Sequence, residues 1–362
     1  MSETLKIGYL CPDEDALALP DTMVTAAAAR ELINSRGGVH GRPIELFAAT
    51  DAGDPARAVR LARSWVDAGV LTVTGTSTAW NEGPMQVLED AGVPFTGAAI
   101  DMAAYMSYVS RPLIGGAASE LLLLAEVTAE RAVNGRVGIV HADMEMAQGA
   151  VAMLMEQPLR QAGIADIQTA PATHGYAEAV KTLATHIPDV IVGLCEASDG
   201  ADVVRSAREH APSAQVVFTG ACLDEARLFR PLGRLAEGLI LTAAFWPYTD
   251  RSHPQVDEFH RAVSGVDGFV PSAFAQGGFA AIMTMADVFR RLGPGVPTPQ
   301  EVLEHLDTSN DQPVYMQTYL SPAKASPLFP SLHNLDTLVL QRRGDELVDV
   351  GGGWRTPAAL SP

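Results

Sequence analysis

Basic residues are scarce in this chain. Its 362 residues include 25 Lys and Arg against 43 Asp and Glu, which gives a formal net charge of −18. A surface this negative repels phosphate backbones and anionic lipid headgroups. We therefore expect no nucleic-acid partner and no attachment to a membrane surface.

Long apolar runs are also lacking. The runs at 121–127 and 238–246 fall well short of the roughly 20 residues that a helix needs to cross a bilayer, so no membrane insertion is expected. The opening residues, MSETLKIGYL, carry neither the basic stretch nor the long apolar run of an export signal. The protein is periplasmic if a signal peptide was removed before Met1, and cytoplasmic if Met1 is the native start.

Cysteine is rare too. Cys11, Cys195 and Cys222 are an odd number with wide spacing and no CxxC pair, so a disulfide framework is not indicated. We expect buried thiols at strand ends, and whether Cys195 and Cys222 pair is left open.

Sequence motifs of common enzyme classes are absent. The chain has no Walker loop, GxSxG elbow, GxGxxG fingerprint, HExxH helix or EF-hand loop, which argues against an enzyme. The nearest approach to a metal-ligand cluster is His141, Asp143 and Glu145, which we interpret as a solvated turn with acids at a helix start. No catalytic residue, metal or cofactor is therefore expected.

What the chain does have is a regular alternation of strand-like and helix-like segments. Asp54 and Pro55, for example, form a helix-start pair. The expected strands are 6–10, 44–48, 71–75, 93–97, 137–143, 189–194, 215–220, 238–245 and short pieces within 313–320, 335–343 and 346–350. The expected helices are 22–35, 55–65, 82–91, 119–132, a helix from 145, a helix from 199, 254–264 and 273–291.

This order predicts an α/β protein with two doubly wound parallel-sheet lobes joined by a multi-strand hinge. We expect residues 1–117 plus 247–320 to form lobe 1, and 118–246 plus 321–362 to form lobe 2. Ligands of open α/β sheets bind at the carboxyl ends of the strands. Function should therefore lie in the loops that follow them.

The segments TAAAARELINSRGGVHGRPIEL and DAGDPARAVRLARSWVDAGV resemble the first βαβ unit of the leucine/isoleucine/valine-binding protein family, which has the periplasmic binding protein type I fold. The likeness continues through EDAGVPF, RVGIVHADMEMAQG, DVIVGL and FVPSAFAQGGFAAI, over about the first 290 residues. It implies a substrate-binding protein whose two lobes close on a small solute and deliver it to an ABC permease. The general pattern also resembles the amide-sensing regulator of the aliphatic amidase operon.

For residues 1–117 of lobe 1 the resemblance implies three ligand-binding residues. Thr78 falls where the family uses a serine hydroxyl to hold the ligand carboxylate, and Ala99 where it uses a backbone contact. Asp101 replaces the threonine that meets the ligand's ammonium group. Thr78 and Asp101 are also preferred residues at helix starts, and that structural role stays open for both.

For the second lobe the resemblance implies a changed pocket. Met146 and Glu196 stand where branched-chain binders place aromatic rings, and Ala221 or Cys222 stands where they place a carboxylate. Phe274, in the part of the chain assigned to lobe 1, matches an aromatic wall of the family's pocket. With that carboxylate gone, Asp101, Glu196 or Asp224 would have to pair a ligand amine, because a buried unpaired charge is costly.

These substitutions favour a small polar amino acid, an amide or a related derivative over a standard branched-chain amino acid. The leading hypothesis is therefore a solute-binding protein of an ABC importer. A cytoplasmic ligand sensor of the amidase-regulator type is the second, and an unrecognised α/β enzyme is the third.

Overall fold

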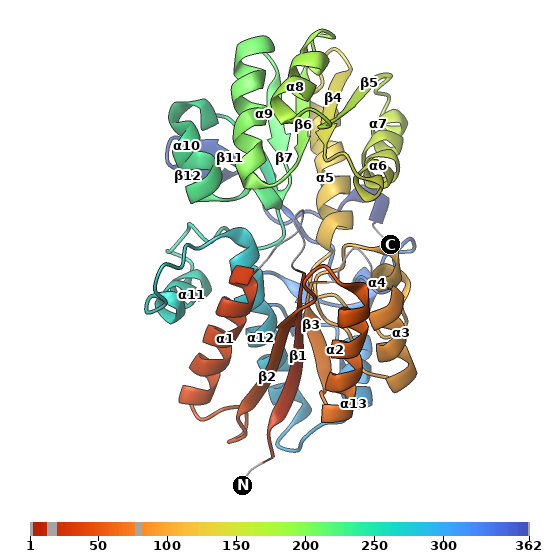
Figure 1. Ribbon diagram of the computed structural model, residues 1–362, viewed down its shortest axis with the longest axis vertical. Helices are drawn as coiled ribbons and strands as arrows, with labels where there is room; N and C mark the ends of the chain where they lie inside the picture. The colour runs from red at the N-terminus through yellow and green to blue at the C-terminus, as the bar shows by residue number, and fades with distance from the viewer. Residues whose placement is uncertain (1–2, 13–19, 77–81, 361–362) are drawn as a thin grey trace. The chain divides into compact units, whose positions relative to one another are not determined.

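The computed structural model describes residues 3–12, 20–76 and 82–360. The chain divides into two compact units, each assembled from separate stretches (Figure 1). Unit 1 is Met1–Ala117, Asp250–Asp336 and Leu360–Pro362, and unit 2 is Ala118–Thr249 and Thr337–Ala359. Residues 321–336, which were expected in lobe 2, are grouped with unit 1, and residues 247–249, which were expected in lobe 1, are grouped with unit 2.

Unit 1 is built on a parallel sheet of order β2-β1-β3, with Ile7 of β1 opposite Leu46 and Thr72 of its neighbours. Its strands are β1 (Leu5–Cys11), β2 (Ile44–Thr50) and β3 (Thr72–Gly75), with the short pair β9 (Gln312–Pro313) and β10 (Tyr319–Leu320). Its helices are α1 (Pro20–Ser35), α2 (Pro55–Ala68), α3 (Glu82–Ala91), α4 (Met102–Met106), α11 (Pro254–Val263), α12 (Ala273–Leu292) and α13 (Pro299–Thr308).

The strand expected at 93–97 forms only as isolated bridges. Phe95 pairs with Val73, and Ala98 with Thr76. Pro94 has no N–H to donate to a ladder, which explains why regular pairing is interrupted there. Residues 95–98 nevertheless lie along the edge of the sheet beside β3, and Ala99 follows them directly.

Helix α2 shows how local signals position these elements. The Asp54 side chain accepts a hydrogen bond from the Ala56 N–H, and Pro55 occupies the first helical position. The helix ends at Gly69, which adopts a left-handed conformation with φ 77°. This confirms the helix start read from the sequence.

Helices α1 and α12 of unit 1 pack closely against each other. The Thr25 hydroxyl of α1 donates to the Ala275 carbonyl of α12 at 2.6 Å. A Cβ on Gly278 would lie 2.2 Å from the Thr22 carbonyl oxygen. The contact therefore depends on glycine at position 278.

Unit 2 contains a larger mixed sheet of order β12-β11-β8-β7-β6-β4-β5. Strands β4, β5, β6, β7 and β8 run parallel to one another. Strand β11 pairs antiparallel with β8, and β12 pairs antiparallel with β11. The strands are β4 (Arg136–His141), β5 (Asp166–Pro171), β6 (Val190–Leu194), β7 (Gln215–Phe218), β8 (Ile240–Ala243), β11 (Leu338–Arg343) and β12 (Glu346–Asp349). The helices are α5 (Gly116–Arg131), α6 (Glu145–Val151), α7 (Gln157–Gln161), α8 (Tyr176–Ala184), α9 (Ala197–His210) and α10 (Arg230–Leu232).

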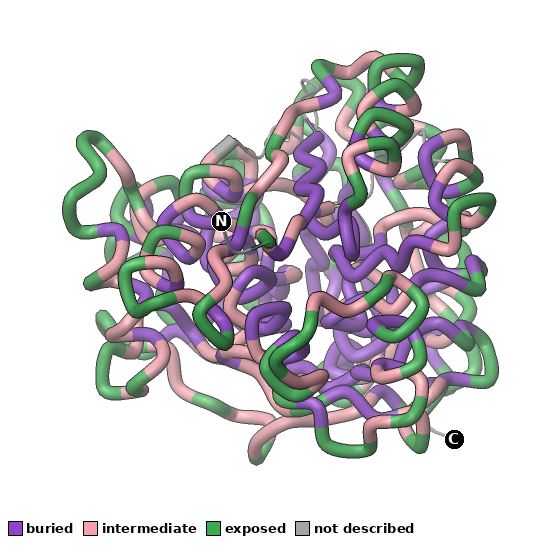
Figure 2. Tube along the Cα trace, turned by 90° about the horizontal axis from the view of Figure 1, so that it is seen from below, coloured by how far each residue is buried: buried purple, intermediate pink, exposed green. Residues whose placement is uncertain are grey.

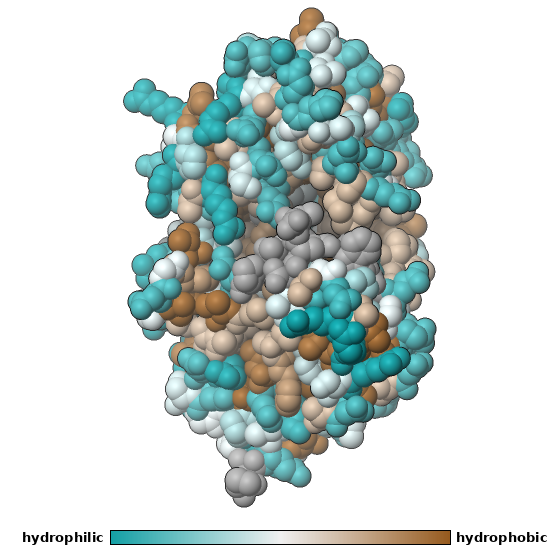
Figure 3. Space-filling view, viewed as in Figure 1, coloured by the Kyte–Doolittle hydropathy of each residue, from teal (hydrophilic) through white to brown (hydrophobic). Residues whose placement is uncertain are grey.

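Buried residues follow the strands and inner helix faces of each unit, and exposed residues gather on the outer turns (Figure 2). In unit 2, Val190, Ile191 and Val192 of β6 are fully buried, as expected for a parallel strand covered on both faces. On the face drawn in Figure 3, hydrophilic side chains predominate over unit 2, whereas apolar side chains gather in groups among hydrophilic ones over unit 1. Among the helices of the described ranges, none is long and apolar enough to span a bilayer.

Candidate functional site

The parallel strands β6 and β7 end at the same edge of the unit 2 sheet, and residues from both connections meet there. Cys195 and Glu196 follow β6, whereas Ala221 and Cys222 lie in the short turn Gly220–Cys222 after β7. The Cys195 and Cys222 sulfur atoms are 3.8 Å apart, and both residues are free thiols. The structure therefore brings together three residues predicted from the sequence, Glu196, Ala221 and Cys222.

Glu196 is a half-buried carboxylate at this edge. It occupies the N-cap position of α9, but its side chain makes no capping hydrogen bond. Burial raises the pKa of its carboxyl group, the nearby Asp199 adds to the rise, and Arg227 opposes it. A desolvated carboxylate in this position gains stability when it pairs with a cation.

The surroundings of Glu196 are electronegative. Asp199, one turn into α9, also has a raised pKa, mainly through burial and secondarily through the charge of Asp202. The pKa of the Tyr176 hydroxyl on α8 is raised chiefly by burial. The negative charges of Cys195, Asp199 and Glu196 raise it further. The edge thus favours an ammonium or other cationic group over an anion.

Asp224 has a different role. Its side chain accepts the Arg227 N–H at 2.7 Å and so caps the following helical turn, Glu225–Phe229. The Arg227 guanidinium lies 3.7 Å from the same carboxylate. Of the two candidate acids in unit 2, Glu196 is therefore better placed to meet a ligand amine.

Glu120 is a further residue at this edge, and it was not predicted from the sequence. It lies on α5 and accepts the Gly220 N–H at 2.7 Å and the Thr242 hydroxyl at 3.4 Å. Burial raises its pKa to about 7. The only sequence signal is an acid followed by the apolar run LLLLA. Glu120 thus positions the turn that carries Ala221 and Cys222.

This placement of Glu120 predicts a pH-dependent stability. Between its ordinary pKa of 4.5 and about 7, the folded protein holds a proton on Glu120 that the unfolded chain has released. Stability therefore falls as the pH rises through this range, by about 3 kcal/mol. Glu120→Gln should remove that part of the slope while leaving an acceptor for the Gly220 N–H. Urea unfolding at several pH values checks this, and an unchanged slope in the variant would refute it.

In unit 1, the predicted ligand-binding residues Ala99 and Asp101 follow the β-bridge between Thr76 and Ala98 in the chain. The Ala99 carbonyl accepts the Tyr105 hydroxyl at 2.7 Å. Asp101 caps α4, with its side chain accepting the Ala104 N–H at 2.9 Å. Its structural role as a cap is thus confirmed, and its ligand role stays a prediction. Thr78 lies outside the described residues.

The two remaining candidates lie on helices. Met146 of α6 in unit 2 is 40% exposed. Phe274 is the second residue of α12 in unit 1 and is half-buried. The Ser272 side chain caps this helix by accepting the Ala275 N–H at 3.2 Å. A ligand role for either residue stays a prediction.

The HADME segment makes local contacts. His141 Nδ1 lies 2.8 Å from the Ala142 carbonyl oxygen, and Asp143 accepts the Thr173 hydroxyl at 2.8 Å. Within residues 3–12, 20–76 and 82–360, no group of three or more His, Cys, Asp or Glu side chains is arranged to hold a metal ion.

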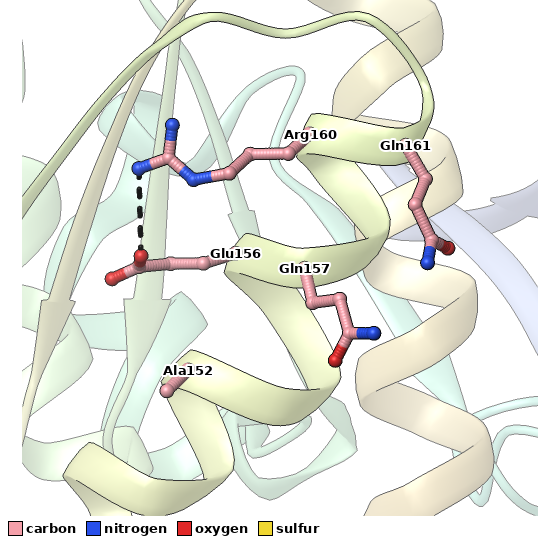
Figure 4. A pocket seen from close by; sticks show the side chains of 5 residues that line it. All are labelled: Ala152, Glu156, Gln157, Arg160 and Gln161. Carbon is pink, nitrogen blue, oxygen red and sulfur yellow. Dashed lines mark ion pairs between the residues drawn. The ribbon is translucent and has the colours of Figure 1, made fainter.

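An open hollow of about 390 Å³ lies in unit 2 along the helix that runs through α6 and α7 (Figure 4). Its lining residues are Ala152, Glu156, Gln157, Arg160 and Gln161. Arg160 and Glu156 form an ion pair at 3.6 Å across it. Because a single helix supplies all these residues, the hollow does not enclose a ligand, and it includes none of the predicted site residues.

Comparison with protein families gives one match, which covers most of the chain. Residues 4–320 match the family described as periplasmic binding protein. No curated protein sequence matches the chain.

Solved structures match over nearly the whole length. A fatty acid ABC transporter substrate-binding protein from Thermomonospora curvata is 14% identical, with a TM-score of 0.80, covering 99% of this chain and 95% of that one. A substrate-binding periplasmic protein from Ralstonia solanacearum is 19% identical, with a TM-score of 0.77, covering 95% and 99%.

A third similar structure is the branched-chain amino acid transporter substrate-binding protein LivJ from Streptococcus pneumoniae in complex with isoleucine. It is 17% identical, with a TM-score of 0.76, and the match covers 98% of this chain and 100% of that one. At these identities the likeness establishes a shared fold, and the two-lobed α/β architecture expected from the sequence is confirmed.

Proposed function

Because the chain belongs to the periplasmic binding protein family, we propose that it is the substrate-binding protein of an ABC importer and captures a small polar amino-acid-like or amide ligand. Binding, rather than catalysis, is the role that this family membership supports. The proposed ligand class rests on one observation about Glu196. Its carboxylate is half-buried at the N-terminus of α9, and it makes no capping hydrogen bond to that helix.

The ligand class follows from charge. A solute with an ammonium or amide N–H would satisfy Glu196, and a charge-assisted hydrogen bond of this kind is among the stronger ones. The carboxylate of a fatty acid, the solute in the name of the Thermomonospora curvata protein, would be repelled by Glu196 and Asp199. An isoleucine, as bound in LivJ, carries a suitable ammonium group but has no polar side chain for the remaining acids.

The proposal names the permease of an ABC importer as partner and an extracytoplasmic compartment as the place of action. Both rest on the family membership. A substrate-binding protein of this kind delivers its solute by docking on the permease, and it needs no metal or cofactor to do so.

A ligand screen tests the proposed function. Amino acids, amides, ureas, small aromatic acids and a medium-chain fatty acid are added to the full chain, and thermal unfolding is followed. A true ligand at 100 times its Kd stabilises the folded protein by about 2.7 kcal/mol. Stabilisation by a polar amine or amide supports the proposal. Stabilisation by the fatty acid alone, or by no solute, would contradict it.

Glu196→Gln is expected to weaken the ligand found in that screen by about 10- to 100-fold, because the charge of its hydrogen-bond acceptor is lost. Calorimetric titration measures the effect. Glu209→Gln is the matched control, since Glu209 lies near the other end of the same helix and its side chain is 75% exposed. Equal affinities for the two variants would remove Glu196 from the site.

A further inference from the structure

Cys195 and Cys222 are close neighbours although 27 positions separate them. Their sulfur atoms are 3.8 Å apart, and the Cys222 thiol donates to the Cys195 carbonyl oxygen at 3.3 Å. They follow β6 and β7, which are adjacent parallel strands of one sheet, so the sheet itself holds them together. A disulfide needs the sulfur atoms to approach to about 2.05 Å, so the bond requires the two atoms to move closer by about 1.8 Å from their present 3.8 Å.

The two thiols differ in access. Cys222 is fully buried, and a Cβ on Gly200 would lie 3.1 Å from its sulfur atom. Cys195 is only partly buried. An external reagent therefore reaches Cys195 first, and Cys222 is placed to resolve the product.

We propose that Cys195 and Cys222 form a reversible disulfide by exchange with a small disulfide or an oxidised dithiol protein. We propose further that this bond changes the ligand affinity of the unit 2 sheet edge that carries Glu196 and Ala221. In the first step, the Cys195 sulfur attacks the oxidant disulfide, and one thiol leaves. In the second step, the Cys222 sulfur attacks the mixed disulfide at Cys195 and releases the other thiol. Two thiols of the protein are oxidised, the oxidant disulfide is reduced, and both protons pass to the released thiols.

The charge around the pair selects the oxidant. Glu196 and Asp199 face Cys222 closely enough to raise the pKa of its thiol, although burial is the main cause. These acids repel an anionic disulfide. A neutral disulfide should therefore react faster with Cys195 than one carrying carboxylates.

The switch follows from where the bond would form. It would tie the connection after β6, which carries Glu196, to the turn after β7, which carries Ala221. Ligand affinity should therefore differ between the oxidised and the reduced protein. This second half of the proposal rests on the proposed function, whereas bond formation does not.

The first test counts thiols. The reduced full chain is treated with hydroxyethyl disulfide or with glutathione disulfide, and thiols are titrated after denaturation. We expect the count to fall from three to one, faster with the neutral reagent, and peptide mapping to show a bond between Cys195 and Cys222. The proposal would be overturned if all three thiols remained, if only mixed disulfides with the reagent formed, or if Cys11 took part in the bond.

Two variants serve as controls. Cys11→Ser, in unit 1, should still form the bond and reach zero thiols. Cys195→Ser should keep both remaining thiols, and because Cys195 is only partly buried this variant should fold. A Cys195→Ser protein that still loses both thiols would overturn the assignment.

The second test measures the affinity of the screened ligand in both redox states. We expect at least a tenfold difference in the wild type and none in Cys195→Ser. A bond that forms without changing affinity would overturn the switch and leave the proposed function intact. Failure of the proposed function would instead appear as no binding in either state, with the thiol count still falling.

Discussion

Gly278→Ala is expected to lower the free energy of unfolding by about 3 kcal/mol, because it forces a methyl group into a closed contact between α1 and α12. The new Cβ would lie 2.2 Å from the Thr22 carbonyl oxygen and 2.7 Å from the Thr25 hydroxyl oxygen. A backbone carbonyl cannot rotate away as a side chain can. The helices must therefore separate, which also strains the hydrogen bond from Thr25 to Ala275.

Gly149→Ala is the matched control for this prediction. Gly149 lies inside α6, and a Cβ there meets nothing within 4 Å. The same substitution should raise stability by about 0.5 to 1 kcal/mol, since alanine favours the helix. Urea unfolding of both variants gives the two values. Similar effects at the two positions would show that helix propensity, rather than packing, decides the outcome.

Asp336→Ala is expected to cost about 3 kcal/mol, because it leaves a largely buried ammonium group without its counter-charge. Asp336 accepts Lys324 Nζ at 2.7 Å and the Thr318 hydroxyl at 2.6 Å. The exposed fractions of the Lys324 and Asp336 side chains are only 20% and 11%. These contacts fasten residues 318–336 to one another, which agrees with their grouping in unit 1.

The control is an exposed aspartate of the same unit. Asp311 pairs with Arg291 at 3.3 Å, but its side chain is 83% exposed. Asp311→Ala should therefore change stability by about 0.5 kcal/mol or less. Adding Lys324→Met to Asp336→Ala should recover part of the loss, since the stranded charge is removed. No recovery in chemical unfolding would mean that the lost hydrogen bond from Thr318, rather than the charge, dominates.

Several parts of the candidate site were within reach of sequence reasoning, and others were not. Glu196 could be placed after β6 because an apolar run is followed by a helix start. Asp101 could be read either as a ligand group or as a cap, and only its hydrogen bond to the Ala104 N–H establishes the cap. Glu120 could not be found, because its partner Gly220 is 100 positions away.

The sequence by itself determined the order of the elements and the type of the fold. Caps such as Asp54, the turn at Gly69 and the apolar runs of β4, β6 and β7 act through neighbours in the chain. Local backbone preferences and burial periodicity are therefore enough to indicate them.

Only the tertiary structure decided which distant groups meet. The approach of Cys195 to Cys222, the hydrogen bond from Gly220 to Glu120 and the antiparallel addition of β11 beside β8 all depend on the order of strands in the sheet. Strand order is set by the packing of complete elements against one another. The residue pattern of a single strand does not show which strands lie beside it, because that depends on packing between segments far apart in the chain.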